Sequence, residues 1–138
     1  MKKLFMLPIL FLLFACEEQG ILTKDGFNNA TINQGAILKY YGTFMPTVGI
    51  SVTGNAKIYL ENNQYKVVLD NFLISEGPDL KVYLSKAATP YDFVTLGNLT
   101  SATVYAIPQG VDVSAYSHVL IYCQQYNHLF AVAQLIQN

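Results

Sequence analysis

The sequence predicts an all-β protein, folded as a single antiparallel β-sandwich or barrel-like domain of seven to eight strands. Tyrosine, phenylalanine and valine are abundant and charged residues are few, a composition that favours strands over helices. No segment after residue 20 carries an apolar stripe with sustained helical spacing. Turn residues recur about every 8–12 positions, as they do in sandwiches and barrels. The hydrophobic pattern does not choose between these two architectures.

The first fifteen residues have the layout of an export signal. Two lysines precede an apolar run over residues 4–14, and the small Ala15 stands before Cys16. The run is shorter than the roughly 20 residues that cross a bilayer. The Leu-Phe-Ala-Cys ending is similar to a bacterial lipobox, in which the cysteine is lipidated and becomes the first residue of the mature protein. We therefore expect an exported, membrane-anchored lipoprotein of the bacterial cell envelope, held by lipid on Cys16.

This interpretation divides the chain into three parts: a signal peptide (1–15), a lipidated tether (16–35) and a β-rich domain (36–138). The tether is polar almost throughout, starting with Glu17 and Glu18. Acidic residues directly after a lipidated cysteine influence sorting in some bacterial lipoproteins, and the alternative is a solvated linker. The sequence does not distinguish the inner from the outer membrane.

The most regular local pattern is a β-hairpin over residues 54–69. Apolar and polar side chains alternate along Gly54–Glu61, which gives the strand two different faces. Asn62 and Asn63 predict a two-residue turn, because asparagine tolerates positive φ. Before the hairpin, residues 36–41 predict an edge strand, and Gly42 opens a separate segment.

Further strands are expected after a turn at Glu76–Asp79. Their ranges are 80–84, 91–96, 102–107, 119–123 and 129–136. In the first of them Leu80, Val82 and Leu84 are expected to point inward, and Lys81 and Tyr83 outward. The segment Val119–Cys123 is apolar throughout, which predicts a place at the centre of the sheet. Residues 112–116 predict a single helical turn.

Cys123 is the first candidate for chemistry. Cys16 and Cys123 are the two cysteines of the chain, so lipid on Cys16 leaves Cys123 without an intramolecular partner. Three interpretations remain open. Cys123 is a small buried hydrophobic residue, a redox thiol that needs some exposure and a nearby positive group, or a ligand of haem or a metal such as copper.

His118 and His128 are the obvious co-ligands in the third interpretation. His118 lies five residues before Cys123, so an unbroken strand puts the two side chains on opposite faces. His128 follows the strand and is able to approach Cys123. Copper or zinc needs three or four ligands, and nothing in the sequence places Met45 nearby as a soft third one. The sequence therefore assigns no metal site, and packed or solvated histidines are the alternative.

The acidic residues and the tyrosines each allow a functional and a structural interpretation. Asp70, Glu76 and Asp79 form either a calcium or acid–base site or an ordinary turn. The tyrosines that alternate with apolar residues bind sugars or pack across strands; they are Tyr59, Tyr83, Tyr105 and Tyr122. A hydrolase or transferase is not expected, since the sequence has no nucleophile elbow, phosphate loop or zinc-protease motif.

The charge balance excludes nucleic acid as an expected partner. The chain contains no arginine, and six lysines face nine carboxylates once the signal is removed. Such a chain lacks the positive charge that neutralises phosphates and the guanidinium fork that recognises them.

Several motifs together resemble the DM-thirteen domain family, over about residues 40–136. They include the run Gly-Pro-Asp-Leu-Lys-Val-Tyr-Leu-Ser at 77–85, Leu-Asp-Asn-Phe at 69–72, Tyr-Ala-Ile-Pro at 105–108, the apolar strand ending in Cys123, and Phe-Ala-Val-Ala-Gln-Leu at 130–135. The resemblance implies an extracytoplasmic β-rich domain, often found beside DOMON and cytochrome b-type domains. It also implies a role in electron transfer, with Cys123 as the family's cysteine, acting as a bare thiol or through a bound group such as haem.

The chain departs from the family pattern at two positions. Tyr122 stands where the family typically has tryptophan, and Ala131 where it typically has glycine. The resulting expectation is a lipid-anchored domain with a redox role centred on Cys123 and an envelope redox partner. The alternative is a non-catalytic envelope binding or scaffold module in which Cys123 is only a core residue.

Overall fold

The computed structural model describes residues 32–138, which form nine strands and one short 3-10 helix. The strands are β1 (Ile37–Pro46), β2 (Val52–Glu61), β3 (Gln64–Ile74), β4 (Leu80–Ser85), β5 (Val94–Asn98), β6 (Val104–Ala106), β7 (His118–Cys123), β8 (His128–Gln134) and β9 (Ile136–Gln137). The helix η1 (Val113–Ala115) precedes β7. The predicted all-β class is therefore confirmed. Within the described residues, no helix has the length and apolar character needed to cross a membrane.

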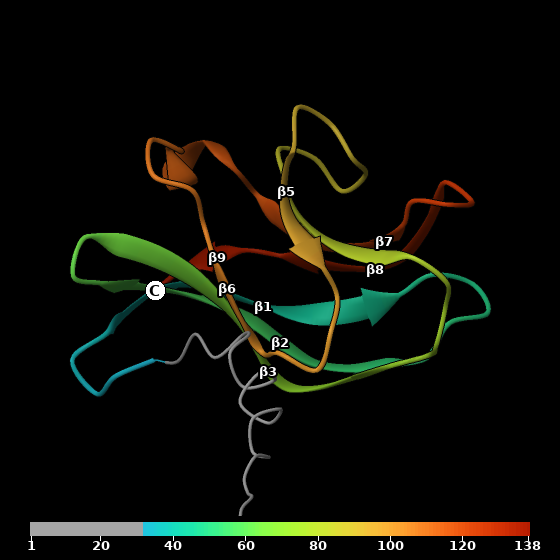
Figure 1. Ribbon diagram of the computed structural model, residues 1–138, viewed down its shortest axis with the longest axis horizontal. Coiled ribbons are helices and arrows are strands. Elements are labelled where there is room, and N and C mark those ends of the chain that lie inside the picture. Colours follow the sequence, from blue (N-terminus) through green and yellow to red (C-terminus); the bar gives the residue numbers. More distant parts are fainter. Residues whose placement is uncertain (1–31) are drawn as a thin grey trace, which may run out of the picture.

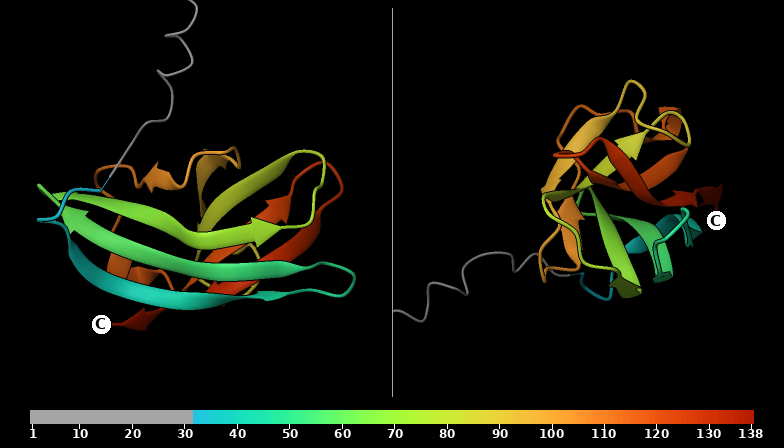
Figure 2. Two further views of the ribbon diagram at one scale, coloured as in Figure 1. Left: turned by 90° about the horizontal axis from the view of Figure 1, so that it is seen from below. Right: turned by 90° about the vertical axis from the view of Figure 1, so that its right-hand side faces the viewer.

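The strands form one strongly curved antiparallel sheet in the order β5-β4-β7-β8-β1-β2-β3-β6, with β9 added beside β1. Seen end-on, they surround a common interior, so the architecture is a nearly closed barrel (Figures 1 and 2). The edge strands β5 and β6 approach each other without forming a ladder. The interior is filled by apolar side chains from nearly every strand.

The prediction of an edge strand over residues 36–41 is wrong. The strand continues without a break to Pro46 and lies in the middle of the sheet, pairing with β2 and β9 along its first part and with β8 at Phe44–Pro46. Gly42 stands where the pairing changes. A Cβ atom there would lie 2.1 Å from the carbonyl oxygen of Gln134, so only glycine permits this close approach of the two backbones.

The predicted hairpin over residues 54–69 is confirmed, and its strands extend further at both ends. Asn62 and Asn63 form the turn with φ of 51° and 66°, the left-handed conformation that asparagine tolerates. Glu61, which belongs to the polar face of this hairpin in sequence, is buried and only 6% exposed. Its carboxylate accepts a hydrogen bond from the Asn33 backbone N–H and pairs with Lys66, each at 2.7 Å, and these contacts lower the pKa of Glu61.

The central position predicted for Val119–Cys123 is also confirmed. β7 lies between β4 and β8, and its middle residues Val119, Leu120 and Ile121 are fully buried. The predicted helical turn corresponds to η1, where the Asp112 side chain accepts a hydrogen bond from the Ser114 N–H. The single last strand predicted over 129–136 is interrupted at Leu135, and Ile136 then pairs with Tyr41 of β1 as part of β9.

Different segments of the chain lie at the two ends of the barrel. At one end Asn33 contacts Glu61, and the C-terminal Asn138 N–H donates to the Lys39 carbonyl. The connections β1–β2, β3–β4 and β7–β8 lie together at the other end (Figure 2, left). Cys123 is at this second end, remote from the point where the described chain begins. The predicted signal and nearly all of the predicted tether, including Cys16, lie outside the described residues.

Candidate functional site

Cys123 is the last residue of β7 and faces the interior of the barrel. It is 1% exposed and belongs to the hydrophobic core. The antiparallel register places it opposite Leu80 of β4 on one side and His128 of β8 on the other. Among residues 32–138 it is the single cysteine and is free of any disulfide.

The connection between β3 and β4, residues 75–79, closes over this thiol. The Cys123 Sγ donates a hydrogen bond to the Pro78 carbonyl oxygen at 3.0 Å, and the next N–H, that of Gln124, donates to the Asp79 carbonyl at 3.1 Å. Gly77 packs directly on the Phe130 ring, and a Cβ at this position would come within 2.6 Å of a ring carbon. We call residues 76–79 the covering turn.

The hydrogen bond at Cys123 is donated by the sulfur. The Pro78 carbonyl is an acceptor only, so the Sγ–H group is the donor. The same contact and the surrounding core keep solvent and other molecules away from the sulfur. Lys81, the cation that follows the covering turn, is paired with Asp79 at 2.9 Å rather than directed at the sulfur. Nucleophilic chemistry at Cys123 therefore requires the covering turn to move away.

His128 is exposed, and its ring lies edge-on to Phe130 with 5.3 Å between the centroids. Within the described part of the chain no three histidine, cysteine or carboxylate side chains converge as a metal site. Cys123 and His128 therefore provide at most two ligands, one of them enclosed.

Haem does not fit at Cys123 in this arrangement. An axial thiolate needs open space on the side of the sulfur that faces iron, and here that side is occupied by the Pro78 carbonyl and the core. Ala131 is fully buried in the same core, directly opposite Ile121, so its methyl group occupies space that a glycine would leave open.

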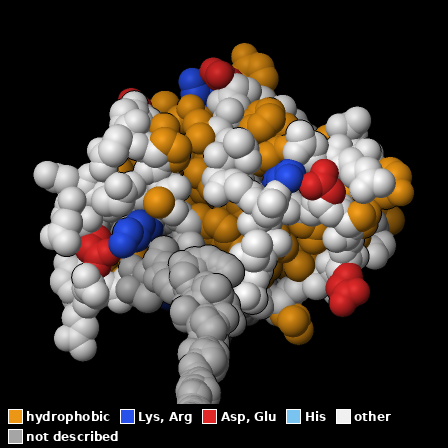
Figure 3. All heavy atoms as spheres, viewed as in Figure 1, with side chains coloured by type: hydrophobic (Ala, Val, Ile, Leu, Met, Phe, Trp, Pro, Cys, Tyr) orange, Lys and Arg blue, Asp and Glu red, His pale blue; other side chains and the backbone are white. Residues whose placement is uncertain are grey.

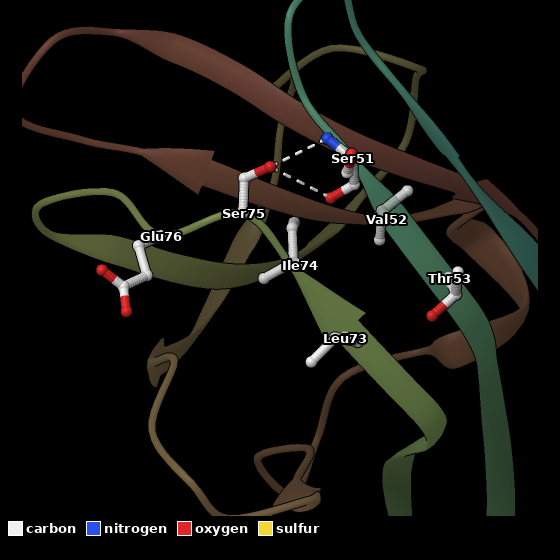
Figure 4. Close-up of a pocket in the computed structure, with 7 residues that line it drawn as sticks. All are labelled: Ser51, Val52, Thr53, Leu73, Ile74, Ser75 and Glu76. Atoms are coloured by element: carbon white, nitrogen blue, oxygen red, sulfur yellow. Dashed lines mark hydrogen bonds between the residues drawn. The ribbon is translucent and has the colours of Figure 1, made fainter.

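An apolar groove of about 400 Å³ lies beside the covering turn, between the ends of β2 and β3 (Figure 4). Its lining residues are Ser51, Val52, Thr53, Leu73, Ile74, Ser75 and Glu76. The Ser51 N–H donates to the Ser75 hydroxyl at 2.8 Å, which ties the two strands together at the mouth of the groove. Cys123 is not among the lining residues, and Glu76 is the one residue that the groove shares with the covering turn.

The three acidic residues considered as a calcium or acid–base site do not converge. Asp70 pairs with Lys57 at 3.2 Å and Asp79 pairs with Lys81, while Glu76 is exposed at the groove. Asp79 has φ of 60°, which is the turn-forming role that its sequence position suggested.

The tyrosines considered for sugar binding serve mainly in packing. Tyr83 points to the outer side of the sheet, as expected, yet it is only 3% exposed, because Phe93 stacks on it at 4.2 Å and Tyr122 at 5.5 Å. Burial raises the pKa of Tyr83, and the neighbouring Tyr122 and Asp79 act in the same direction. The Tyr105 hydroxyl donates to the Ala102 carbonyl and is likewise part of the scaffold.

His118 lies on the outer face of the sheet, away from Cys123, as the strand alternation predicts. Its Nδ1 and the Ser117 hydroxyl are joined by a hydrogen bond of 2.7 Å, and partial burial lowers its pKa. It lines a hollow of about 350 Å³ together with Thr43, Met45, Ala88, Val132 and Gln134. Sequence reasoning missed this grouping, because Met45 and His118 are brought together only by the pairing of β1, β8 and β7.

Comparison with known proteins identifies the family. No curated protein and no solved structure gave a significant match to the chain. The family model described as "Electron transfer DM13" matches residues 47–135, which include the covering turn and Cys123. This match extends over more than half of the chain and agrees with the resemblance found in the sequence. The chain belongs to the electron transfer DM13 family.

Proposed function

We propose that this protein is a lipid-anchored redox domain of the bacterial cell envelope, in which the unpaired Cys123 exchanges electrons with a partner protein. The observation that carries the proposal is the position of Cys123: a thiol without a partner cysteine in residues 32–138, enclosed by a single turn inside a domain of an electron transfer family. Lipid on Cys16 anchors the protein and keeps Cys123 from forming an intramolecular disulfide.

The arrangement of the barrel supports a partner that binds at the Cys123 end. The described chain begins at the opposite end, so the proposed anchor joins the barrel away from the Cys123 end. Exposed apolar side chains belong to the connections at this end, with Val48 96% and Tyr126 67% exposed. Hydrophobic side chains also gather at the right-hand end of the molecule in Figure 3, over the same connections. Exposed apolar groups of this kind mark protein contact surfaces.

The reaction begins when partner binding displaces the covering turn and breaks the hydrogen bond from Cys123 Sγ to the Pro78 carbonyl oxygen. The thiol then loses its proton to water, and the thiolate attacks one sulfur of a disulfide in the partner. The partner's S–S bond breaks as the bond between Cys123 and that sulfur forms. The second partner sulfur leaves as a thiolate and takes up a proton. The partner disulfide is the oxidant, and Cys123 is left in a mixed disulfide with the partner. A thiolate of a second, reduced protein then attacks the partner's sulfur in that mixed disulfide, which releases Cys123 as a thiol and leaves the second protein oxidised.

A specific observation favours the second candidate, a non-catalytic envelope binding module. Cys123 is as buried as the aliphatic residues around it, and its thiol proton is already hydrogen-bonded. In that case the exposed apolar end binds a partner, and Cys123 contributes only packing.

The rate at which Cys123 reacts with a small aromatic disulfide, together with a visible absorption spectrum, tests the proposal. The reaction is followed in native buffer and in urea, with the Cys123→Ala variant as the control. The redox proposal predicts a colourless protein whose native thiol reacts, through opening of the covering turn, much faster than the protein unfolds. A thiol that reacts only as fast as global unfolding contradicts the proposal and supports the binding module.

A further inference from the structure

We propose that the end of the barrel where the described chain begins rests directly on the lipid bilayer. The contact is made by three exposed apolar side chains, those of Ile37, Tyr41 and Ile136, which we call the tether-side patch. This inference rests on the lipid anchor at Cys16 proposed above. It adds to that anchor a contact between the folded domain and the membrane surface.

The pairing of β1 with β9 brings the patch together. Tyr40 packs against the core, so the next residue, Tyr41, points to the outer face of the sheet. Ile136 of β9 is paired directly with Tyr41 and therefore shares this face. Ile37 is the first residue of β1, so the apolar surface continues to the end of the barrel.

The chain joins the barrel beside this patch. The Asn33 N–H donates to the Glu61 carboxylate at 2.7 Å, and the Ala36 N–H donates to the Asn33 carbonyl at 3.1 Å. The chain is therefore fixed to the barrel just before Ile37. The described chain begins, and β9 and the C-terminus lie, at the same end of the barrel (Figure 2, left).

The length of chain outside the described part favours the bilayer as the occupant of the patch. Residues 17–32 separate Cys16 from Asn33, and at about 3.5 Å per residue this distance is at most roughly 60 Å. Lipid on Cys16 keeps the patch within that reach of the membrane. The effective concentration of bilayer at the patch is then high, so a weak contact is sufficient to hold the barrel on the surface.

The chemistry of the patch suits a membrane surface. Isoleucine gains free energy on leaving water, and tyrosine suits the interface because its ring is apolar while its hydroxyl stays in contact with water. Lys39, at the bulge of β1, forms no ion pair with a carboxylate among residues 32–138, so its charge is left for anionic headgroups. Glu61 is buried and paired with Lys66, so this pair adds no net charge.

Methyl NMR of the full lipidated protein in phospholipid nanodiscs tests the contact. The nanodiscs contain phosphatidylcholine and phosphatidylglycerol with a small fraction of lipid that carries a paramagnetic headgroup, and mass spectrometry first measures the lipid on the protein. Ile50 follows β1 and Ile74 ends β3, so both lie at the opposite end of the barrel. The proposal predicts a paramagnetic relaxation enhancement at least tenfold larger at the methyl groups of Ile37 and Ile136 than at those of Ile50 and Ile74.

Substitutions separate direct contact from tethering alone. Tyr41→Ser and Ile136→Ser remove apolar surface but leave the anchor in place, and each is expected to reduce the enhancement at the Ile37 methyl at least threefold. Val48→Ser and Tyr126→Ser are the matched controls, because they remove apolar side chains at the opposite end, and they are expected to leave this enhancement unchanged. All four side chains are exposed, so the fold is expected to persist.

Four results would overturn the inference. Equal enhancement at the two ends would mean that the tethered barrel presents no particular face, and a larger enhancement at Ile50 and Ile74 would turn the other end to the membrane. Changes at Ile37 and Ile136 that follow the number of proteins per nanodisc would make a second copy the occupant. A processed protein without lipid would remove the anchor itself, whereas the redox step is judged separately by the reactivity of Cys123.

Discussion

Cys123 and His118 stand at the two ends of one strand, β7, and on opposite faces of it. Cys123 faces the core and is enclosed by the covering turn, so its chemistry depends on motion. His118 is half-buried and lines a hollow on the outer side of the sheet. Strand alternation therefore gives the two ends of one strand different surroundings, an enclosed thiol and a half-buried imidazole beside an open hollow.

The largest expected effects concern the packing on the two faces of β7. Ile121 is fully buried in the core, and Leu120 is fully buried on the outer face. We expect Ile121→Ala and Leu120→Ala each to lower the free energy of unfolding by about 2–5 kcal/mol, because both leave a cavity. Urea denaturation measures this, with the exposed Val48→Ala as a control expected to stay within about 0.5 kcal/mol of the parent. A Leu120→Ala variant as stable as the control would show that the outer face is not a packed layer.

Removing the Ser85 hydroxyl tests whether the outer face of the sheet can be destabilised without exposing Cys123 on the inner face. Ser85 is fully buried, and its oxygen donates to the Thr89 carbonyl and accepts from the Tyr91 N–H. Ser85→Ala leaves both groups unsatisfied, at an expected cost of about 1–3 kcal/mol. Chymotryptic cleavage at Tyr91 should become faster, while alkylation of Cys123 keeps its rate relative to global unfolding. Selective acceleration at Cys123 instead would contradict the independence of the two faces.

Much of the scaffold around these faces could be predicted from the sequence. The Asn62-Asn63 turn and the alternation that follows it are local signals, and the apolar run of β7 indicates burial on both sides. The continuation of β1 through Gly42 was not predictable in this way. A glycine at position 42 suggested that the strand ends there. The position requires glycine because the backbone of Gln134, far away in the sequence, lies too close for a side chain.

In the candidate sites, too, some features follow from local sequence and others depend on residues far away in the chain. The importance of Cys123 follows from cysteine count and family resemblance, but its enclosure depends on Pro78, 45 residues earlier in the chain. Likewise, the alternation of β4 places Tyr83 outward correctly, whereas its burial depends on stacking by Phe93 and Tyr122. No local pattern encodes contacts of this kind.

A smaller effect is expected on the pH dependence of stability, through His118 on the outer face. Burial lowers the pKa of His118 below its ordinary value of 6.5, so the unfolded chain binds a proton more readily than the folded one. The stability associated with neutral His118 is present above pH 6.5 and is lost as the pH falls from there through the folded-state pKa. Urea midpoints between pH 5 and pH 8 should therefore fall less steeply toward acid in His118→Gln than in the parent. Identical slopes would mean that His118 is not desolvated.

In the proposed reaction the covering turn controls access to Cys123, and the sharpest test is the rate at which Cys123 is alkylated in the Gly77→Ala variant. The added methyl would collide with the Phe130 ring, and because this ring is buried in the core we expect the turn to be displaced. Gly35→Ala adds a methyl in open space and serves as the control. We measure alkylation rates under native conditions, together with the free energy of unfolding of each variant. We expect Cys123 to react at least tenfold faster in Gly77→Ala than in Gly35→Ala, beyond any increase explained by the lower global stability of Gly77→Ala. Equal rates after that correction would contradict it.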